Sequence, residues 1–225
     1  MRKLYIIGAG GFGAEVEWLV NELQQEYDLR YSVEAFVNQL LDDPQHVQKK
    51  DGQTHCGLPV ISGRELLEIT KSVVCELAIA IGDVGGRRGS FFKLPSTNIN
   101  FPTLIHPSVV YDDRKGRIIF SEGTIVCANT TLTTNIQVGK FVHINLDCTI
   151  GHDVIIHDFC TLSPGVHISG KVIIEEGVFL GTGAVVLPGI KIGHNSTIGA
   201  GAVVTKDIPS GVIAVGIPAK IVNKN

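Results

Sequence analysis

Residues 138–174 read VGKFVHINLDCTIGHDVIIHDFCTLSPGVHISGKVII and carry an apolar side chain at every sixth position. The same period extends from Phe120 to Val204, where all fifteen positions reached in steps of six are apolar. A small or β-branched residue follows most of these anchor positions four residues later, as at Cys148 and Cys160. A helix repeats every 3.6 residues and a flat strand every 2, so a period of six fits neither element alone.

The six-residue period predicts a solenoid of hexapeptide repeats. Each six-residue segment forms a short strand and a turn, and three segments close one triangular coil of about 18 residues. Residues 120–204 then make about five coils, with the anchor side chains stacked in the interior. Cys148 and Cys160 fall on the small inward positions, so we expect both to be buried spacers.

Residues 1–100 show a different pattern, in which short apolar runs alternate with stretches of helical periodicity. The predicted strands are residues 3–8, 32–38 and 76–82, and the predicted helices are residues 14–25 and 63–72. This alternation predicts a small parallel α/β domain.

Polar and turn-forming segments separate these elements. Residues 39–57 are expected to form a surface loop, and residues 101–116 a strand and loop that lead into the solenoid. We therefore expect one domain over residues 1–100 and a second over residues 101–225.

The composition excludes several classes of function. The 19 Lys and Arg residues face 22 Asp and Glu residues, and a formal net charge of -3 argues against binding to nucleic acid. Since no apolar run reaches about 18 residues, membrane insertion is not expected. The five cysteines are an odd number without CxxC spacing, which is typical of a protein in a reducing compartment. We therefore expect a cytoplasmic protein.

Residues 8–13, GAGGFG, match the pattern G-x-G-x-x-G between a predicted strand and a predicted helix. Small residues at such a turn let a phosphate group reach backbone N–H groups at the start of the helix. NAD would require an acidic residue at the end of the second strand, where this chain has Asn38. A nucleotide-linked substrate, a purely structural turn and NAD all remain open, in that order of preference.

His152 and Asp153 are adjacent at a predicted turn of the solenoid. A neutral imidazole held by a carboxylate suits a general base working near pH 7. His143, His157 and His167 lie nearby, but His143, His152 and His157 occupy different positions within their hexads, so their convergence on a metal ion is not expected.

Taken together, the IIGAGGFGAEV opening, the AIGD segment, IHPSV, the hexads, NLDCTIGHDVIIHDFCTLSPG and the closing GIPAKIV resemble one family. It is the sugar O-acyltransferase group, which includes sialic acid O-acetyltransferases and bacterial N-acetyltransferases acting on UDP-linked 4-amino-4,6-dideoxy sugars. The resemblance implies a left-handed β-helix, a homotrimer with active sites between adjacent subunits, and acetyl-CoA as acyl donor without a metal.

The resemblance also implies roles for individual residues. His152 matches the catalytic base and Asp153 the acid beside it. The acetyl-CoA site is implied at Asn145, Gly170, Thr182 and Ala200, with the Gly170 N–H group as the expected oxyanion donor. For the nucleotide sugar, Gly10 and Gly11 match the relatives, whereas Phe12 stands where His is frequent and Asn38 stands where an acid is usual.

We therefore predict acetyl-CoA-dependent N-acetylation of a UDP-linked 4-amino-4,6-dideoxy sugar by direct transfer, with His152 as general base. Acetylation of a sugar hydroxyl, as in sialic acid O-acetyltransferases, is the first alternative, and a non-catalytic ligand-binding solenoid is the second.

Overall fold

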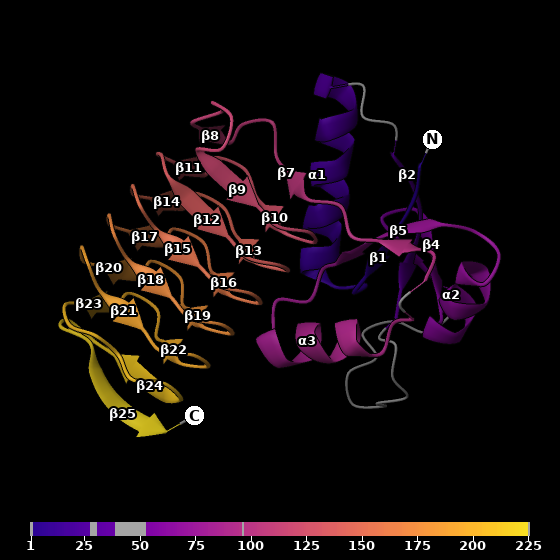
Figure 1. Ribbon diagram of the computed structural model, residues 1–225. Helices are drawn as coiled ribbons and strands as arrows, with labels where there is room; N and C mark the ends of the chain where they lie inside the picture. The colour runs from indigo at the N-terminus through magenta and orange to yellow at the C-terminus, as the bar shows by residue number, and fades with distance from the viewer. Residues whose placement is uncertain (1, 28–30, 39–52, 96, 225) are drawn as a thin grey trace. The chain divides into compact units, whose positions relative to one another are not determined.

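A computed structural model describes residues 2–27, 31–38, 53–95 and 97–224. The chain divides into two compact units, residues 1–104 and residues 105–225 (Figure 1).

The first unit contains a mainly parallel sheet with the strand order β3-β4-β2-β1-β5-β6. Its strands are β1 (Arg2–Ile7), β2 (Tyr31–Val37), β3 (Thr54–His55), β4 (Leu58–Ile61), β5 (Cys75–Ile79) and β6 (Ile99–Asn100). Its helices are α1 (Gly11–Tyr27), α2 (Gly63–Thr70) and α3 (Val84–Phe92). Strand β5 is buried throughout and β1 is buried from Leu4 to Ile7, as expected for parallel strands covered on both faces. The α/β fold predicted for this region is thus confirmed.

Helix α3 and strands β3, β4 and β6 of this unit were not predicted from the sequence. Thr54 and His55, which were expected in a loop, form β3 and pair antiparallel with β4; residues 39–52 of that loop lie outside the described residues. Helix α3 was not predicted, because its three glycines (residues 85, 86 and 89) lower helix propensity. The Asp83 side chain caps this helix by accepting a hydrogen bond of 2.6 Å from the Gly86 N–H group.

Close packing around the turn between β1 and α1 explains why two positions of the GAGGFG motif, Gly8 and Gly13, are glycine. Gly8 has a φ of 116°, and a Cβ atom there would lie 2.5 Å from the Ala80 carbonyl oxygen. A Cβ atom at Gly13 would lie 2.0 Å from the Gly8 carbonyl oxygen. Any larger residue at either position would separate α1 from the strands that precede it and lie beside it.

The second unit is a left-handed parallel β-helix with three faces. Each coil adds one strand to each face. Face 1 consists of β7 (Leu104–Ile105), β10 (Ile125–Val126), β13 (His143–Ile144), β16 (Thr161–Leu162), β19 (Phe179–Leu180), β22 (Thr197–Ile198), β24 (Val212–Val215) and β25 (Lys220–Lys224). Face 2 consists of β8 (Val110–Tyr111), β11 (Thr131–Leu132), β14 (Thr149–Ile150), β17 (His167–Ile168), β20 (Val185–Val186) and β23 (Val203–Val204). Face 3 consists of β9 (Ile118–Phe120), β12 (Ile136–Val138), β15 (Ile155–Ile156), β18 (Ile173–Ile174) and β21 (Lys191–Ile192).

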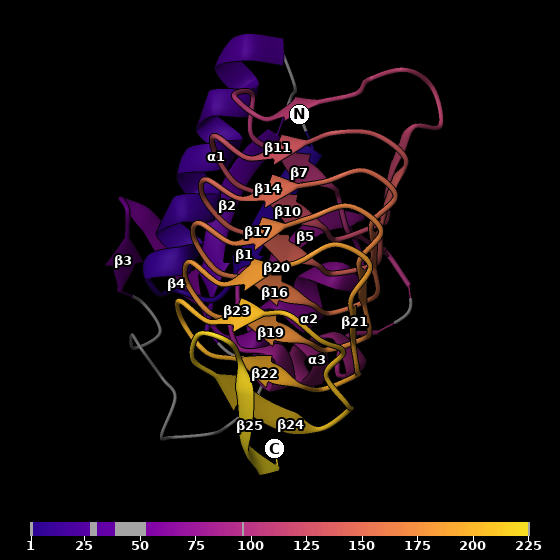
Figure 2. The same ribbon diagram turned by 90° about the vertical axis from the view of Figure 1, so that its left-hand side faces the viewer.

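The register confirms the predicted coil length. Each strand pairs with the strand one coil later, so that Val126 lies opposite Ile144 and Ile144 opposite Leu162. Figure 1 shows the strands of face 3 stacked as a ladder, and Figure 2 shows the same for face 2. The anchors from Val126 onward are buried in one continuous core, as the hexad pattern predicts.

Polar side chains at the small inward positions of the β-helix donate hydrogen bonds to backbone carbonyl oxygens in a repeating pattern. The Thr124 hydroxyl donates to the Gly139 carbonyl oxygen at 2.8 Å, and the Thr130 hydroxyl donates to the Asn145 carbonyl oxygen at 3.0 Å. The buried thiols of Cys148 and Cys160 make the equivalent contacts with carbonyl groups of the next coil. These interior positions therefore carry polar atoms without leaving them unsatisfied.

The corners between faces share one backbone conformation. Every sixth residue from Gly123 to Gly201, three positions after each anchor, has a φ between 53° and 72°. Gly, Asn and Asp occupy most of these positions, since they enter the left-handed region most readily. Phe141, Phe159 and Lys171 are exceptions, and the rings of Phe141 and Phe159 stack at a centroid distance of 5.3 Å.

The β-helix extends beyond the hexads at both ends. Strands β7 and β8 form part of a first coil in the segment expected to be a linker, and an irregular turn at residues 112–117 interrupts the six-residue period there. At the other end, β25 pairs antiparallel with β24. An antiparallel strand cannot continue the coil, so it ends the parallel stack.

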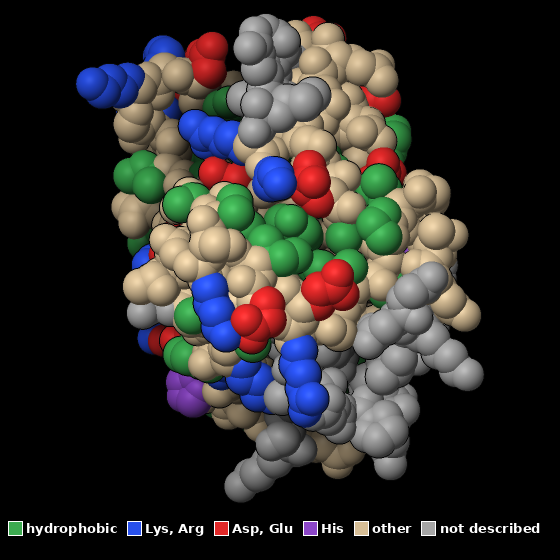
Figure 3. All heavy atoms as spheres, turned by 90° about the vertical axis from the view of Figure 1, so that its right-hand side faces the viewer, with side chains coloured by type: hydrophobic (Ala, Val, Ile, Leu, Met, Phe, Trp, Pro, Cys, Tyr) green, Lys and Arg blue, Asp and Glu red, His purple; other side chains and the backbone are tan. Residues whose placement is uncertain are grey.

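Charge is mixed rather than concentrated on the face of the molecule drawn in Figure 3, where Lys and Arg side chains lie among Asp and Glu side chains. No helix within the described ranges is long and apolar enough to cross a membrane.

Candidate active site

The His152–Asp153 pair lies at the corner between faces 2 and 3, which we call corner 2–3 and which includes residues 133–135, 151–154 and 169–172. His152 Nδ1 lies 2.7 Å from Asp153 Oδ2. Successive side chains of an extended strand point to opposite sides, but the left-handed φ of 59° at Asp153 turns the chain and lets the carboxylate meet the preceding ring. With Nδ1–H donating to the carboxylate, Nε2 is left as the proton acceptor.

The pKa of the Asp153 carboxyl group is lowered, first by its hydrogen bond with His152 and next by one from Asn135. Asp153 is therefore a carboxylate at any pH near neutrality. Both side chains of the pair are accessible, with 56% of the His152 side chain and 44% of the Asp153 side chain exposed. An accessible base with an oriented second nitrogen is suited to removing a proton from a bound acceptor.

Gly170 occupies the position of His152 one coil later. A Cβ atom at Gly170 would lie 2.6 Å from His152 Nε2 and 2.7 Å from Cε1, so the imidazole lies directly over this glycine. The Gly170 N–H group makes no hydrogen bond within the described residues. An unpaired backbone N–H group can donate a hydrogen bond to a developing oxyanion.

Asn145, Thr182 and Ala200 lie on a different corner of the prism. They belong to the turns between faces 1 and 2, which we call corner 1–2 and which includes residues 127–130, 145–148, 163–166, 181–184 and 199–202. There the Asn145 side chain accepts a hydrogen bond of 2.7 Å from the Leu146 N–H group, and Thr182 and Ala200 are exposed. Within one chain, face 2 separates these three residues from His152, so a single β-helix does not bring the predicted site residues together.

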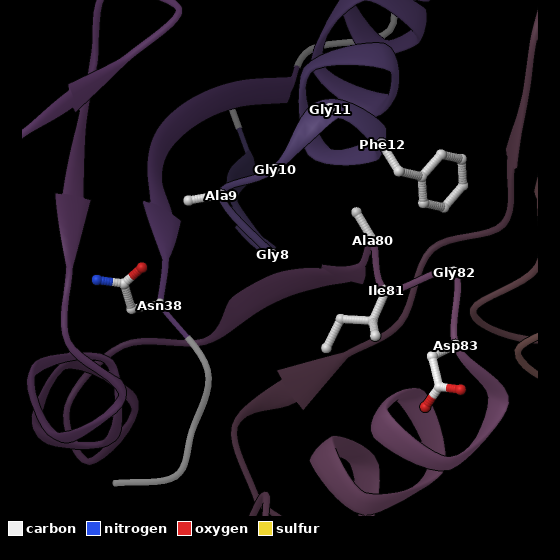
Figure 4. A pocket seen from close by; sticks show the side chains of 10 residues that line it. All are labelled: Gly8, Ala9, Gly10, Gly11, Phe12, Asn38, Ala80, Ile81, Gly82 and Asp83. Atoms are coloured by element: carbon white, nitrogen blue, oxygen red, sulfur yellow. The ribbon is translucent and has the colours of Figure 1, made fainter. Parts of the chain in front are cut away.

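The predicted nucleotide-sugar residues do come together in the first unit. Gly10, Gly11, Phe12 and Asn38 line one pocket of about 240 Å³ with Gly8, Ala9 and residues 80–83. Asn38 lies at one side of this pocket, and Phe12 and Asp83 lie at the other (Figure 4). The pocket opens at the carboxyl ends of β1, β2 and β5, the edge at which parallel sheets bind ligands.

Two residues beside this pocket were not among the predicted site residues. His55 Nε2 lies 3.1 Å from the Gly10 carbonyl oxygen, and its ring packs edge-on against Phe36. The side chain of Arg87 is fully buried, and Nη1 donates to the carbonyl oxygens of Ile81 and Gly82 at 2.7 and 3.2 Å. Arg87 thereby fixes the loop that forms one wall of the pocket. His55 belongs to no local motif and reaches this place through tertiary packing, whereas Arg87 follows shortly after the AIGD segment of residues 80–83.

Among the described residues, no three His, Cys, Asp or Glu side chains are grouped so that they could hold a metal ion. His143 is buried, whereas His157 and His167 are exposed, and His167 Nδ1 lies 2.8 Å from the Thr149 hydroxyl group.

Comparison with known proteins shows what this architecture is used for. The PglD N-terminal domain matches residues 3–94, and the bacterial transferase hexapeptide (six repeats) matches residues 171–206. A GDP-perosamine N-acetyltransferase of Escherichia coli O157:H7 is 30% identical over 214 residues, which are 94% of this chain and 81% of that protein. The chain belongs to the hexapeptide-repeat sugar acetyltransferases.

Solved structures of related acetyltransferases match this chain over nearly its whole length and support this assignment. The perosamine N-acetyltransferase of Caulobacter crescentus, solved with CoA and GDP-perosamine, has a TM-score of 0.80 and 29% identity, and the match covers 100% of this chain and 98% of that one. The acetyltransferase domain of PglB from Neisseria gonorrhoeae FA1090, solved with acetyl coenzyme A, has a TM-score of 0.82 and 31% identity, covering 98% and 99%. The predicted fold, family and acyltransferase class are thus confirmed.

Proposed function

We propose that this acetyltransferase transfers an acetyl group from acetyl-CoA to the amino group of a nucleotide-linked 4-amino-4,6-dideoxy sugar, and that His152 is the general base. The observation that carries this proposal is the geometry at corner 2–3, where the oriented imidazole of His152 lies over Gly170, whose N–H group makes no hydrogen bond within the described residues. One group accepts a proton and the other stabilises negative charge, which are the two requirements of direct acyl transfer.

In the proposed reaction, His152 Nε2 takes a proton from the acceptor nitrogen as that nitrogen attacks the thioester carbonyl carbon. The carbonyl oxygen becomes an oxyanion and accepts a hydrogen bond from Gly170 N–H. Collapse of this intermediate breaks the carbon–sulfur bond and releases CoA, whose thiolate can take up the proton from His152. Asp153 holds the ring and stabilises its protonated form.

Direct transfer is supported by the state of the cysteines. Cys75, Cys127, Cys148 and Cys160 are buried, and Cys56, the exposed one, lies in the first unit. Burial raises the pKa of the Cys148 thiol to about 11, which disfavours the nucleophilic thiolate. No covalent acyl-cysteine intermediate is therefore proposed.

The acetyl-CoA and sugar sites are proposed from their placement. Asn145, Thr182 and Ala200 of corner 1–2 would bind the acyl donor, and the pocket around Gly10, Gly11, Phe12 and Asn38 would bind the nucleotide. Because corners 1–2 and 2–3 are separated within one chain, we propose a homotrimer in which adjacent subunits each contribute one corner to a shared site.

The nucleotide is the part of the proposal that most needs a direct assay. The sequence resemblance favours a UDP-linked sugar, whereas the relatives from Escherichia coli and Caulobacter crescentus use or bind GDP-perosamine. CoA release would be measured with a UDP-linked 4-amino-4,6-dideoxy sugar, with GDP-perosamine and with free sialic acid. Turnover of either nucleotide sugar with none of sialic acid would support N-acetylation and identify the nucleotide.

Acetylation of a sugar hydroxyl is the second candidate. It is favoured by a galactoside O-acetyltransferase of Escherichia coli K12 that is 34% identical over 116 residues, although these are only 48% of this chain and 44% of that protein. CoA release with sialic acid and with neither nucleotide sugar would support this alternative. Failure to bind acetyl-CoA in calorimetry would favour the remaining alternative, a non-catalytic ligand-binding solenoid.

A further inference from the structure

We infer that Asn135 is a positioning residue for this reaction, because its side chain fixes the Asp153 carboxylate that orients His152. This inference rests on the proposed role of His152 as general base. Asn135 lies at corner 2–3 one coil before Asp153, and its Nδ2 donates to Asp153 Oδ1 at 3.1 Å. The other carboxylate oxygen, Oδ2, is the one that contacts His152.

The two carboxylate oxygens of Asp153 contact different partners, Asn135 and His152, and together these contacts fix the orientation of the carboxylate. A carboxylate held only by His152 can rotate about its Cβ–Cγ bond and exchange that contact for water, especially since 44% of the Asp153 side chain is exposed. The second hydrogen bond, from Asn135, opposes this rotation. The backbone adds a third restraint, since the Asp153 N–H group donates to the Thr134 carbonyl oxygen at 3.1 Å.

Arg117 determines which way the Asn135 amide faces. Arg117 Nη1 donates to Asn135 Oδ1 at 2.8 Å. Since a guanidinium group only donates, it selects the oxygen of the amide and leaves the Nδ2 group toward the carboxylate. Arg117 therefore donates to Asn135, and the Asp153 carboxylate accepts one hydrogen bond from Asn135 and another from His152.

The backbone explains why asparagine suits this position. Asn135 has a φ of 55°, a conformation that asparagine tolerates better than most side chains. Glycine tolerates it as well but has no amide group to offer the carboxylate. Asn135→Gly therefore removes the side chain without imposing backbone strain, which makes it the informative substitution.

The test compares kcat for CoA release in the wild type, Asn135→Gly, Asp153→Asn and the double variant, with the nucleotide sugar that the wild type turns over. Asn135→Gly is expected to lower kcat about tenfold with little change in KM, the usual size of effect for a partner that orients a functional side chain. In the Asp153→Asn background it should cause no further loss, because Asn135 acts only through that carboxylate. Asn195→Gly is the matched control, since Asn195 has a similar φ of 53° at a corner between faces 3 and 1.

Each other outcome contradicts a different part of the argument. A wild-type kcat in Asn135→Gly, together with a large loss in His152→Ala, overturns the role of Asn135 alone. An equal loss from Asn135→Gly with and without Asp153 shows that Asn135 does not act through the carboxylate and also overturns the inference. A wild-type kcat in His152→Ala shows that His152 is not the base, and the role of Asn135 falls with it.

Discussion

At the scale of single residues, the decisive feature is the contact between two neighbours in the sequence. His152 and Asp153 meet because Asp153 has a left-handed backbone, and Asn135 and Asp153 have this conformation because they occupy equivalent corner positions in successive coils. The same regularity that builds the β-helix therefore places the functional groups of corner 2–3 in one column.

Replacing the proposed base is the first test at this scale. His152→Ala is expected to lower kcat by about 10²–10⁴-fold, the usual range for loss of a positioned proton acceptor, while the affinity for acetyl-CoA and the melting temperature stay nearly unchanged. Stability should be preserved because 56% of the side chain is exposed. Steady-state kinetics and thermal melting of the same preparation measure both effects.

His157→Ala is the control for that variant, because His157 is an exposed residue on the next turn of the same coil. A loss of less than threefold in kcat for His152→Ala would end the assignment of the base. If His157→Ala showed the large loss instead, the base would be His157.

Two glycines of corner 2–3 should respond differently to the same added methyl group. A Cβ atom at Gly170 would displace the exposed imidazole of His152, which can move, so Gly170→Ala should lower kcat about tenfold or more with a small change in melting temperature. A Cβ atom at Gly151 would lie 2.7 Å from the Gly170 backbone nitrogen, which cannot move without separating the coils. Gly151→Ala should therefore lower the melting temperature by several degrees. Equal loss of stability in the two variants would contradict this distinction.

At the scale of elements, the β-helix could be predicted almost completely between residues 120 and 204. The reason is that the apolar residue at every sixth position is the one that faces the buried core. The corner conformation was harder to see. Phe141, Phe159 and Lys171 interrupt the series of Gly, Asn and Asp residues at the left-handed positions. The first coil was missed because the irregular turn at residues 112–117 breaks the six-residue period.

In the α/β unit, the predictable elements were those with a strong hydrophobic pattern. Helix α3 and strand β3 lack such a pattern, and both depend on contacts that the local sequence does not report. Asp83, the residue that caps α3, also lines the pocket, so the N-terminus of the missed helix borders the candidate site.

Corner positions offer a test of backbone strain that is independent of catalysis. Lys171 has a φ of 61° and is exposed, so Lys171→Gly should raise the free energy of unfolding by about 1 kcal/mol by removing the strain of an L-residue in the left-handed region. Gly165 has a φ of 68°, and a Cβ atom there would make only ordinary contacts of 4.0 Å with Gly183, so Gly165→Ala should lower the same free energy by about 1 kcal/mol. Chemical denaturation at one protein concentration measures both changes, and changes of the same sign would refute the strain argument.

The buried thiols of Cys148 and Cys160 offer a test of the packing of the β-helix, and the Cys148 thiol also offers a test of how stability depends on pH. At pH 8, iodoacetamide should modify the exposed Cys56 and leave Cys148 and Cys160 unmodified until the protein unfolds, as mass spectrometry of tryptic peptides would show. Burial raises the pKa of the folded Cys148 thiol from 9.0 to about 11. Between these values the unfolded thiol ionises and the folded thiol does not, so this thiol's contribution to stability is present below about pH 9 and is lost as the pH rises toward 11. Alkylation of Cys148 in the native protein at pH 8 would contradict this account.

At the scale of the whole molecule, the proposal of a shared site rests on the spacing of the proposed site residues along the chain. His152 and Gly170 differ by one coil, and so do Thr182 and Ala200, so each pair shares a corner. The spacing of seven residues between Asn145 and His152 places them on different corners. Once the coil length of about 18 residues is known, the sequence shows which corner each residue occupies. The six-residue period alone does not, because it is the same on all three faces.

A site divided between corners can be tested by mixing two inactive chains. His152→Ala removes the base at corner 2–3, and Ala200→Trp is expected to block the acyl-donor site at corner 1–2, where residue 200 is exposed. In a homotrimer of about 72 kDa, three times the chain mass of 24.1 kDa, each shared site takes one corner from each of two neighbours. A site with a wild-type corner 2–3 from one chain and a wild-type corner 1–2 from the other is intact.

Co-expression of the two variants in equal amounts should therefore restore about a quarter of the wild-type kcat, because random assembly makes about one interface in four intact. Each variant expressed alone should be inactive. A mixture of the two separately purified variants should also be inactive if their trimers do not exchange subunits. Differently tagged chains, purified in tandem, would confirm that the active fraction contains both variants. If each chain carried a complete site of its own, no mixture of the two variants could recover activity, so an inactive co-expressed trimer would refute the shared site. Light scattering that showed a monomer near 24.1 kDa with full activity would refute it independently.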